Sequence, residues 1–266
     1  MKCLALDLDG TLTNSEKRIT PRTLQALLLA QERGVCVILA SGRPVCGQRP
    51  LAEQLQLQRF GGYILAFNGG TIVRCATGEH LVRTTLPHHL LPRIIDAATS
   101  RGFDLLSYQG DIMLSNNTAN PHVQYAARIN GMQLEQPADL TAALVQPVPK
   151  CIIVGEPERL AVLEKEMQET FADMLNCVRS EPFFLEIMPC GIDKAARLQW
   201  LLQQIGARRE DLVACGDGFN DISMLRFAGI GVAMGNAQPA VKEVADFVTL
   251  DNNNDGLVPV VERFFF

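Results

Sequence analysis

The sequence predicts an α/β fold built on a doubly wound parallel sheet, into which a second unit of mixed helices and strands is inserted. Near both ends of the chain, short apolar runs alternate with helix-like stretches, and each run is continuously apolar, as in parallel strands covered on both faces. Between about residues 87 and 182 the pattern changes to short strands and hairpins. With 266 residues, 47% of them hydrophobic and 20% charged, the chain has room for one large or two modest domains.

The first expected elements are a strand and a helix. "CLALDL" (residues 3–8) is short and apolar and is ended by acids, which indicates a buried strand. Residues 20–34 follow the pattern of a helix: Thr20 suits the N-cap, Pro21 the first turn and Gly34 the left-handed exit. These two elements begin the strand–helix–strand alternation of a parallel sheet.

Further apolar runs continue this alternation. Residues 35–43 ("VCVILASGR") and 63–70 ("YILAFNGG") indicate a second and a third buried strand. After the variable middle of the chain, a helix is expected from about residue 190, and residues 211–221 ("DLVACGDGFND") repeat the opening theme of an apolar strand ended by acids. "GIGVAMGNA" and "DFVTL" indicate two more short strands.

The middle third of the chain reads as a separate α+β insert. Residues 90–102 and 157–175 have helical spacing of their apolar side chains. Residues 103–116 resemble a hairpin whose turn is the Gly110–Asp111 pair.

Composition and charge exclude several classes of function. The net charge is −5 and the sequence pI is near 5.4, whereas nucleic-acid binding needs Lys and Arg to replace counterions, so we expect no nucleic-acid partner. The eight cysteines form no CxxC pair and are expected to be reduced thiols of a cytoplasmic protein. No export signal opens the chain and no apolar run is long enough to span a bilayer, so no membrane is expected.

Polar side chains are expected where three of the predicted strands end. Asp7, Ser41 and Asp217 each follow an apolar run, and ligands of open parallel sheets bind beyond the carboxyl ends of the strands. With Asp9 and Asp221 nearby, the crevice would hold several carboxylates that repel one another unless a cation is present. Oxygen ligands without His or Cys favour a hard ion such as Mg²⁺.

The same crevice offers groups suited to a phosphate. Lys194, at the start of a predicted helix, is the obvious fixed cation. Ser41 and Gly42 offer a hydroxyl and an uncovered backbone N–H, and Asn220 adds a neutral donor. Because a phosphate would add negative charge to the acids, a metal ion would have to carry part of it.

Four ordered motifs, "DLDGT", "SGR", "GIDK" and "GDGFND", resemble those of the haloacid dehalogenase superfamily over nearly the whole chain. "FNGG" and "DNNNDG" are similar to the Cof-type, class IIB branch, whose α+β cap lies between the second and third motifs. The resemblance implies a Rossmann-like catalytic core of residues 1–83 and 188–266, and a specificity cap of residues 84–187. The one departure is Ala195, where the family commonly has glycine after the motif lysine.

The resemblance also implies a role for each motif residue. Asp7 is the expected nucleophile, which forms an aspartyl-phosphate, and Asp9 the expected proton carrier. Mg²⁺ is expected on Asp7, on the backbone carbonyl of Asp9 and on Asp217. The expected phosphate ligands are Leu8, through its backbone N–H, and Ser41, Gly42, Lys194 and Asn220. Thr11 and Asp221 are expected to support the site from behind these ligands.

The function that follows is a Mg²⁺-dependent phosphatase of small phosphorylated metabolites, such as sugar phosphates or pyridoxal phosphate. One alternative is a phosphotransferase or mutase that uses the same Asp7 chemistry with a sugar hydroxyl as acceptor. A second alternative, a non-catalytic phosphometabolite-binding regulator, is disfavoured because the acids and Lys194 are all present. A dehalogenase is disfavoured because carbon–halogen displacement needs neither Mg²⁺ nor Asp9. We expect a monomer or a weak homodimer.

Other polar and aromatic residues receive plainer interpretations. His88 and His89 are expected at the surface near a helix start, without a metal, because no spaced partner accompanies them. Asn236 and Asp251, near the later strand ends, suit either the site or a turn. For the closing Phe264–Phe266, packing against the core and a contact patch both remain open.

Overall fold

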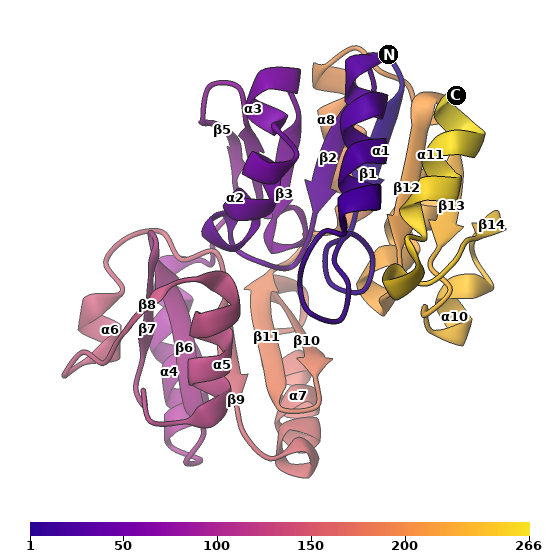
Figure 1. The fold of residues 1–266 in the computed structure, drawn as a ribbon. Coiled ribbons are helices and arrows are strands. Elements are labelled where there is room, and N and C mark those ends of the chain that lie inside the picture. The colour runs from indigo at the N-terminus through magenta and orange to yellow at the C-terminus, as the bar shows by residue number, and fades with distance from the viewer. The chain divides into compact units, whose positions relative to one another are not determined.

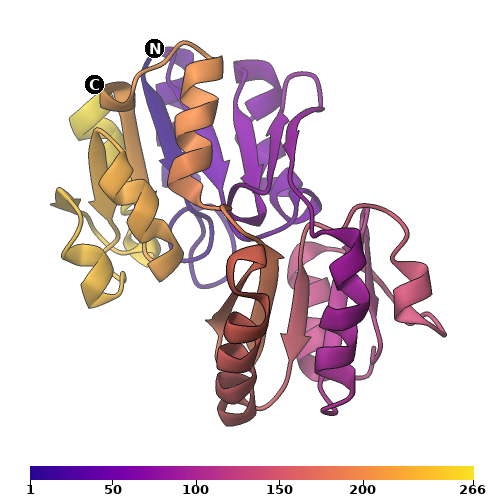
Figure 2. The same ribbon diagram turned by 180° about the vertical axis from the view of Figure 1, so that it is seen from behind.

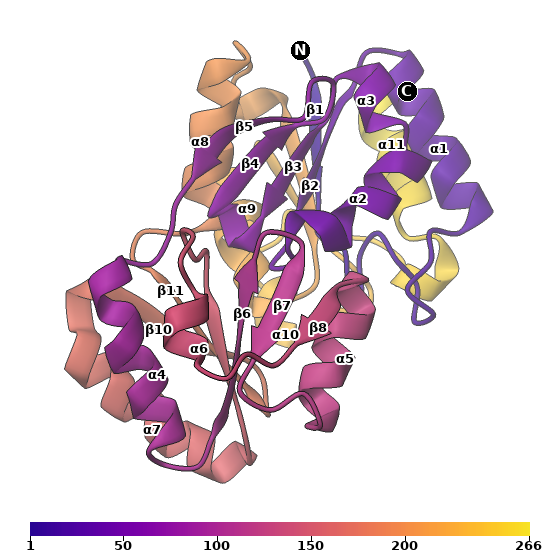
Figure 3. The same cartoon turned by 90° about the vertical axis from the view of Figure 1, so that its left-hand side faces the viewer.

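The computed structural model describes all 266 residues and divides the chain into two compact units. Unit 1 comprises Met1–Val82 and Asp193–Phe266, and unit 2 comprises Arg83–Ile192. The sequence placed the second junction near residue 187; in the structure the strand that leads to it continues to Pro189 and keeps this segment in unit 2. Figures 1, 2 and 3 show the elements of each unit from three sides.

Unit 1 is a sheet covered by helices on both faces. Its strands are β1 (Cys3–Leu6), β2 (Cys36–Ala40), β3 (Tyr63–Ala66), β4 (Thr71–Arg74), β5 (Glu79–Arg83), β12 (Leu212–Gly216), β13 (Ile230–Ala233) and β14 (Phe247–Val248). Its helices are α1 (Pro21–Glu32), α2 (Val45–Gln54), α3 (Leu57–Phe60), α8 (Lys194–Gln204), α9 (Ile222–Phe227), α10 (Pro239–Lys242) and α11 (Leu257–Phe265).

The order of the strands places β1 at the centre of this sheet. The order is β14-β13-β12-β1-β2-β3-β4-β5, and the pairs from β14 to β3 are parallel, whereas β4 runs antiparallel to β3. The chain winds outward from β1 through β2 and β3, and later resumes on the other side at β12. Such a change of direction opens a crevice at the carboxyl ends of the strands. The predicted doubly wound α/β fold is confirmed.

Alternate residues of the strands pack into two apolar layers, one on each face of the sheet. Cys3 and Ala5 of β1 belong to a core with the inner faces of α8 and α9, and Leu4 and Leu6 are fully buried on the opposite face. Figure 1 shows α1 and α11 side by side in front of the sheet, and Figure 2 shows α8 and α9 on the other side. Burial on both faces explains why these strands are continuously apolar.

The helix that follows β1 begins and ends where the sequence predicts. The Thr20 side chain accepts a hydrogen bond from the backbone N–H of Thr23, Pro21 occupies the first turn, and Gly34 has φ +86°. The N-cap oxygen and the left-handed glycine satisfy backbone groups that a helix end leaves without partners.

Unit 2 is a six-stranded sheet in the order β10-β11-β9-β6-β7-β8. Its strands are β6 (Asp104–Gln109), β7 (Ile112–Ser115), β8 (Gln133–Glu135), β9 (Cys151–Val154), β10 (Leu175–Glu181) and β11 (Phe184–Pro189). Its helices are α4 (Leu91–Thr99), α5 (Pro121–Asn130), α6 (Leu140–Ala143) and α7 (Pro157–Phe171). The predicted hairpin is confirmed, since β6 and β7 pair antiparallel across Gly110 and Asp111.

One face of this second sheet is covered by α4 and α7, which Figure 2 shows in front of the strands. Their apolar residues, among them Ile94 and Leu163, form a core with Leu105, Ile153 and Leu185 of the sheet. Because the sheet is mostly antiparallel, its strands can be joined by short hairpins. This explains why the middle of the sequence shows short strands and turns in place of long strand–helix alternation.

Candidate functional site

The first component of the site is the tight turn that follows β1. The backbone N–H of Asp7 continues the parallel ladder to the carbonyl of Cys215 on β12 (3.0 Å), so the side chain of Asp7 projects just past the end of the strand. Thr13 closes the turn, because its N–H and its hydroxyl both donate to the carbonyl of Leu8 (2.9 Å each). Leu8 itself is buried.

Gly10 brings this turn against the loop after β12. It has φ +86°, and a Cβ at this position would collide with the carboxylate of Asp217. The hydroxyl of Thr11 donates to Asp217 Oδ1 (2.9 Å). A glycine is therefore required here for both its conformation and its lack of a side chain.

Lys194 lies at the centre of the buried charges. It is the first residue of α8, whose N-cap Asp193 accepts from the N–H of Ala196, and its Nζ donates to Asp7 Oδ1 (2.7 Å) and Asp221 Oδ1 (2.6 Å). Burial alone would lower the pKa of Lys194, but the charges of Asp221 and Asp7 outweigh it and the pKa lies above its ordinary value. The two neighbouring carboxylates therefore stabilise the charged form of Lys194.

The surroundings of Asp7, in contrast, disfavour its charged form. Burial, and after it the negative charge of Asp221, raise the pKa of Asp7 well above its ordinary value, although Lys194 opposes the shift. Burial also raises the pKa of Asp217, to about 6. Both shifts have the sign expected of carboxylates crowded together in a place with little water.

Asp221 shapes the loop after β12. Its Oδ2 accepts from the backbone N–H groups of Asp217 (3.0 Å) and Gly218 (2.9 Å), while its Oδ1 faces Lys194. The side chain is fully buried, and a Cβ on Gly216 would lie 2.5 Å from it. With both oxygens engaged in this way, Asp221 fixes the direction in which Asp217 points.

The acids present a donor set that fits a hard divalent cation. One carboxylate oxygen from each of Asp7, Asp217 and Asp221 lies within 4.8 Å of the others. All donors are oxygens, without His or Cys, which is the set that Mg²⁺ accepts. Asp221 is fully buried and its oxygens are held by Lys194 and by two backbone N–H groups. Asp7 is held by Lys194 through only one oxygen, and Asp217 is less buried and accepts only from neutral side chains, so these two are the side chains best placed as ligands.

Ser41 and Gly42 follow β2 directly, as predicted. The backbone N–H of Ser41 donates to the carbonyl of Leu65 (3.0 Å), and its hydroxyl oxygen accepts from the N–H of Arg43 (3.2 Å). These contacts hold the loop in a sharp turn at the carboxyl edge of the sheet.

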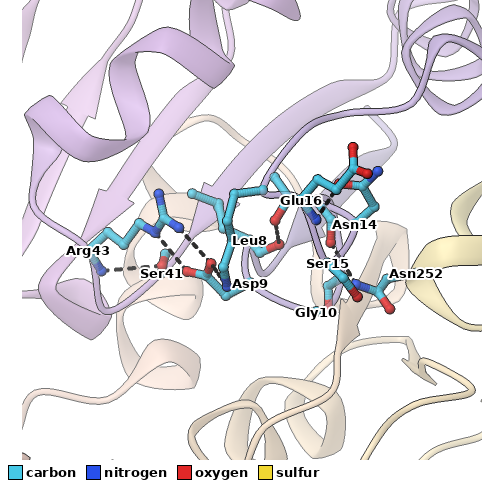
Figure 4. Close-up of polar contacts among 12 residues, drawn as sticks. Leu8, Asp9, Gly10, Asn14, Ser15, Glu16, Ser41, Arg43 and Asn252 are labelled. Carbon is cyan, nitrogen blue, oxygen red and sulfur yellow. Dashed lines mark hydrogen bonds and ion pairs between the residues drawn. The ribbon is translucent and has the colours of Figure 1, made fainter. Parts of the chain in front are cut away.

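Asp9 is held by two cations that the sequence analysis did not assign to the site. Arg43 donates from Nε to Asp9 Oδ2 (2.7 Å) and from a terminal nitrogen to Oδ1 (2.6 Å), as Figure 4 shows, and Lys17 Nζ donates to Oδ1 (2.6 Å). Burial would raise the pKa of Asp9, but the hydrogen bonds and charge of Arg43, followed by those of Lys17, lower it below its ordinary value.

Two asparagines complete the edge of the site. Asn220 is exposed, and its Nδ2 donates to Oδ1 of Asn68 (3.1 Å), which comes from the turn after β3. Asn236 donates from Nδ2 to the carbonyl of Gly10 (2.9 Å) and to Asp217 Oδ2 (3.2 Å), so it belongs to the site. The carboxylate of Asp251 instead accepts from the N–H groups of residues 253 and 254, which is a turn role.

Of the site residues that the sequence analysis did not assign, some lie within its motifs and one does not. Arg43 and Asn68 stand inside the quoted "SGR" and "FNGG" stretches, so the motifs themselves pointed to them. Lys17 had no signal, because its contact depends on the left-handed conformation (φ +59°) of a loop residue. His88 and His89 are exposed, as predicted, and no helix of the structure has the length and apolarity required to cross a membrane.

Comparisons with known proteins identify the family of this chain. The family model for haloacid dehalogenase-like hydrolases matches residues 4–261. A 5-amino-6-(5-phospho-D-ribitylamino)uracil phosphatase of Bacillus subtilis is 31% identical over 265 residues, which cover 99% of this chain and 96% of the relative.

Among solved structures, a haloacid dehalogenase-like hydrolase of Bacteroides thetaiotaomicron is 44% identical with a TM-score of 0.96, and 99% of each chain is covered. A HAD subclass IIB sugar phosphatase is 26% identical with a TM-score of 0.85, and 99% of each chain is covered. The chain therefore belongs to the haloacid dehalogenase-like hydrolase family and is an enzyme of its phosphatase branch.

Proposed function

We propose that this protein is a Mg²⁺-dependent phosphatase that hydrolyses small phosphorylated metabolites through an aspartyl-phosphate on Asp7. The observation that carries the proposal is the convergence of Asp7, Lys194 and Asp217 from three separate segments on one edge of the sheet. The names of two relatives, a sugar phosphatase and a 5-amino-6-(5-phospho-D-ribitylamino)uracil phosphatase, support phosphate monoesters of small molecules as the substrate class.

The residues divide the work of the first step as follows. Asp7 attacks the phosphorus through the oxygen that Lys194 does not hold; a bond forms from this oxygen to phosphorus and the bond to the leaving oxygen breaks. Asp9 gives its proton to the leaving oxygen. Mg²⁺, held by Asp7, the carbonyl of Asp9 and Asp217, would neutralise part of the charge on phosphate and carboxylate.

In the second step water attacks the phosphorus of the aspartyl-phosphate, Asp9 takes a proton from the water, and the carboxylate of Asp7 is released. The lowered pKa of Asp9 suits this step, because an ionised carboxylate is the form that accepts a proton. For the first step Asp9 must be protonated. A bound phosphate competes for the charges of Arg43 and Lys17, and this competition raises the pKa of Asp9 toward that state.

The proposed phosphate ligands surround this centre. Ser41 contributes its hydroxyl, Gly42 and Leu8 contribute backbone N–H groups, and Lys194 contributes a buried cation. Asn220 contributes an amide N–H. Asp221 and Thr11 hold Lys194 and Asp217 in place, consistent with a supporting role.

We further propose that unit 2 is the cap that selects the leaving group, and that the protein acts in the cytoplasm as a monomer or a weak homodimer. A screen of phosphate release across sugar phosphates, pyridoxal phosphate and nucleotide-related monoesters would identify the substrate. The screen is then repeated with free sugars as phosphate acceptors. A hydrolase should turn over its substrate at the same rate with or without a sugar, whereas a phosphotransferase should turn over faster when the sugar is present.

The test of the chemistry is phosphate release from an aryl phosphate. We expect turnover with Mg²⁺, none with excess EDTA, and inhibition by Ca²⁺, which is larger and accepts more oxygen ligands, so that it can bind both oxygens of Asp7. Full activity of the metal-free protein, or equal turnover with Ca²⁺, would contradict the mechanism. Asp7→Asn serves as the matched inactive control.

A further inference from the structure

The turn after β3 carries an unexplained backbone strain close to the site. Phe67 and Asn68 both adopt left-handed conformations, with φ of +53° and +55°, and Gly69 follows with φ +102°. Left-handed backbone is uncommon for residues other than glycine, and clusters of it occur where the surrounding structure demands a particular geometry. Two glycines stand at positions 69 and 70, yet the chain places a side chain at position 68.

This turn contacts the loop that carries Ser41 and Gly42. The N–H of Asn68 donates to the carbonyl of Ser41 (2.9 Å), and the N–H of Phe67 donates to that of Arg43 (3.1 Å). A Cβ on Gly42 would lie 3.5 Å from the amide nitrogen and oxygen of Asn68, so the amide rests against Gly42.

The same turn also packs on the helix that carries Lys194. A Cβ on Gly69 would collide with the side chain of Arg197 in the first turn of α8 and would lie 3.3 Å from the carbonyl of Asp193. Position 69 therefore tolerates only glycine, and the turn is fixed between the Ser41 loop and α8.

The amide of Asn68 then has one partner beyond this turn, Asn220. Asn220 donates one Nδ2 hydrogen to Oδ1 of Asn68 at 3.1 Å. An amide nitrogen carries two hydrogens, and fixing one leaves the second in a defined direction. Without this acceptor, the exposed side chain of Asn220 would be free to rotate.

We infer that Asn68 is a positioning residue that orients the Asn220 amide toward the phosphate of the substrate. This inference rests on the proposed function, because Asn68 can have this role only if Asn220 binds the phosphate. Asn68 acts through Asn220 and need not itself touch the substrate. Asparagine suits the position because it tolerates left-handed backbone better than most side chains while offering an acceptor.

The test is a double-mutant cycle between Asn68→Gly and Asn220→Ala. Glycine keeps the left-handed backbone without strain and removes only the amide, so the variant is expected to fold. We measure the affinity for inorganic phosphate by calorimetry in Mg²⁺ and kcat/KM with an aryl phosphate. Each single variant should lose about five- to tenfold in both quantities, the effect of one hydrogen bond. The double variant should be no worse than Asn220→Ala by more than about twofold.

Gln56→Gly is the matched control. Gln56 is exposed and also has a positive φ (+52°), but it lies at the start of α3, and its side chain bonds only Arg59 among the contacts of the structure. The Gln56→Gly variant should leave phosphate affinity and kcat/KM unchanged. It should shift the thermal midpoint by as much as Asn68→Gly does, because both variants place glycine at a position with left-handed backbone.

Two outcomes overturn the inference alone while the wild type remains active. In the first, Asn68→Gly binds phosphate like the wild type; the side chain then only shapes a turn. In the second, the losses multiply in the double variant; Asn68 then acts independently of Asn220. Failure of the wild type to bind phosphate or to release it overturns the proposed function and, with it, this inference.

Discussion

The two units each bury a lysine with carboxylates, and the two arrangements differ in their balance of charge. In unit 2, Lys150 lies directly before β9, and its Nζ donates to Glu186 Oε1 of β11 at 2.7 Å in a buried ion pair. In unit 1, Lys194 faces Asp7 and Asp221, and Asp217 lies close by. Three acids therefore share one buried cation.

This difference separates a structural pair from a site prepared for a ligand. A balanced buried pair is tolerated because each charge compensates the other. Burial, and after it the negative charge of Asp221, raise the pKa values of Asp7 and Asp217, so ionised acids in this place raise the free energy of the folded protein. An excess of such acids is retained where a cation and a phosphate are to be bound, and perturbed carboxylates in a crevice are a marker of function.

The largest effect that tests this comparison is expected for Asp7→Asn. Without the nucleophile, phosphate release should fall on the order of 10⁴-fold or more. In EDTA the thermal midpoint should stay constant or rise, because Lys194 keeps Asp221 while one repelling charge is removed. Thermal unfolding of both proteins without metal checks the second part.

Asp221→Asn is the contrasting variant for the same measurement. Asp221 accepts from two backbone N–H groups as well as from Lys194, so its loss should lower the midpoint. If Asp7→Asn unfolds as early as Asp221→Asn does, the acids of unit 1 form a structural cluster and the comparison fails.

The next largest effect is expected for Asp9→Asn, which keeps the backbone carbonyl and removes only the proton carrier. Turnover of an alkyl phosphate should fall by about 10²- to 10⁴-fold. With a nitrophenyl phosphate the leaving group needs little protonation, so Asp7 should still be phosphorylated while water attack is slowed.

Rapid acid quench with a phosphorus-labelled aryl substrate, followed by peptide mapping, checks this assignment. Label on Asp7 in the Asp9→Asn variant, absent from Asp7→Asn, supports it. Label on Asp9, or hydrolysis without any covalent intermediate, would reverse or remove the two roles.

The strand ends could be predicted from the sequence because a simple rule governs them. Asp7, Ser41 and Asp217 each follow an apolar run directly, and parallel strands bring their carboxyl ends to one edge. Lys194 could be placed because a helix begins there and its N-cap is the preceding aspartate.

The contacts of Asp9 and Asn68 could not be predicted in this way. The Asp9–Arg43 pair depends on the conformations of two loops, and no local pattern relates residues 9 and 43. "FNGG" indicates a turn, but the left-handed conformations of Phe67 and Asn68 follow from the packing of that turn between α8 and the Ser41 loop. The end of β11 at Pro189 likewise depends on its pairing with Leu175 of β10.

The balanced pair of unit 2 supplies the third prediction. Lys150→Met should destabilise the protein by about 3–5 kcal/mol, because Glu186 is left buried without this lysine. The double variant Lys150→Met/Glu186→Met should recover most of this loss, since apolar side chains can replace a buried pair at little cost.

Urea unfolding of the single and double variants measures both values. A double variant as unstable as the single would show that the pair is not a self-contained unit, and the contrast with Lys194 would be lost. The folded double variant should also retain phosphate release from a small aryl substrate.

The smallest expected effect concerns the solvent accessibility of the cysteine thiols in the two units. Cys190 in unit 2 is exposed, whereas Cys75 in unit 1 is partly covered and burial raises its pKa to about 12. The thiolate is the reactive form, so Cys75 is almost fully protonated at pH 8, while Cys190 lies open to a reagent.

A disulfide reagent at pH 8 should therefore modify Cys190 faster than the buried thiols of the native protein, and all eight thiols after unfolding in guanidinium. Cys190→Ser should remove the fast phase and leave turnover of an aryl phosphate unchanged. Peptide mapping identifies the modified thiols. Fast modification of a buried thiol such as Cys3 or Cys215 would mean that the core opens readily to solvent, which would contradict the tightly packed sheet on which the arrangement of the charged site residues depends.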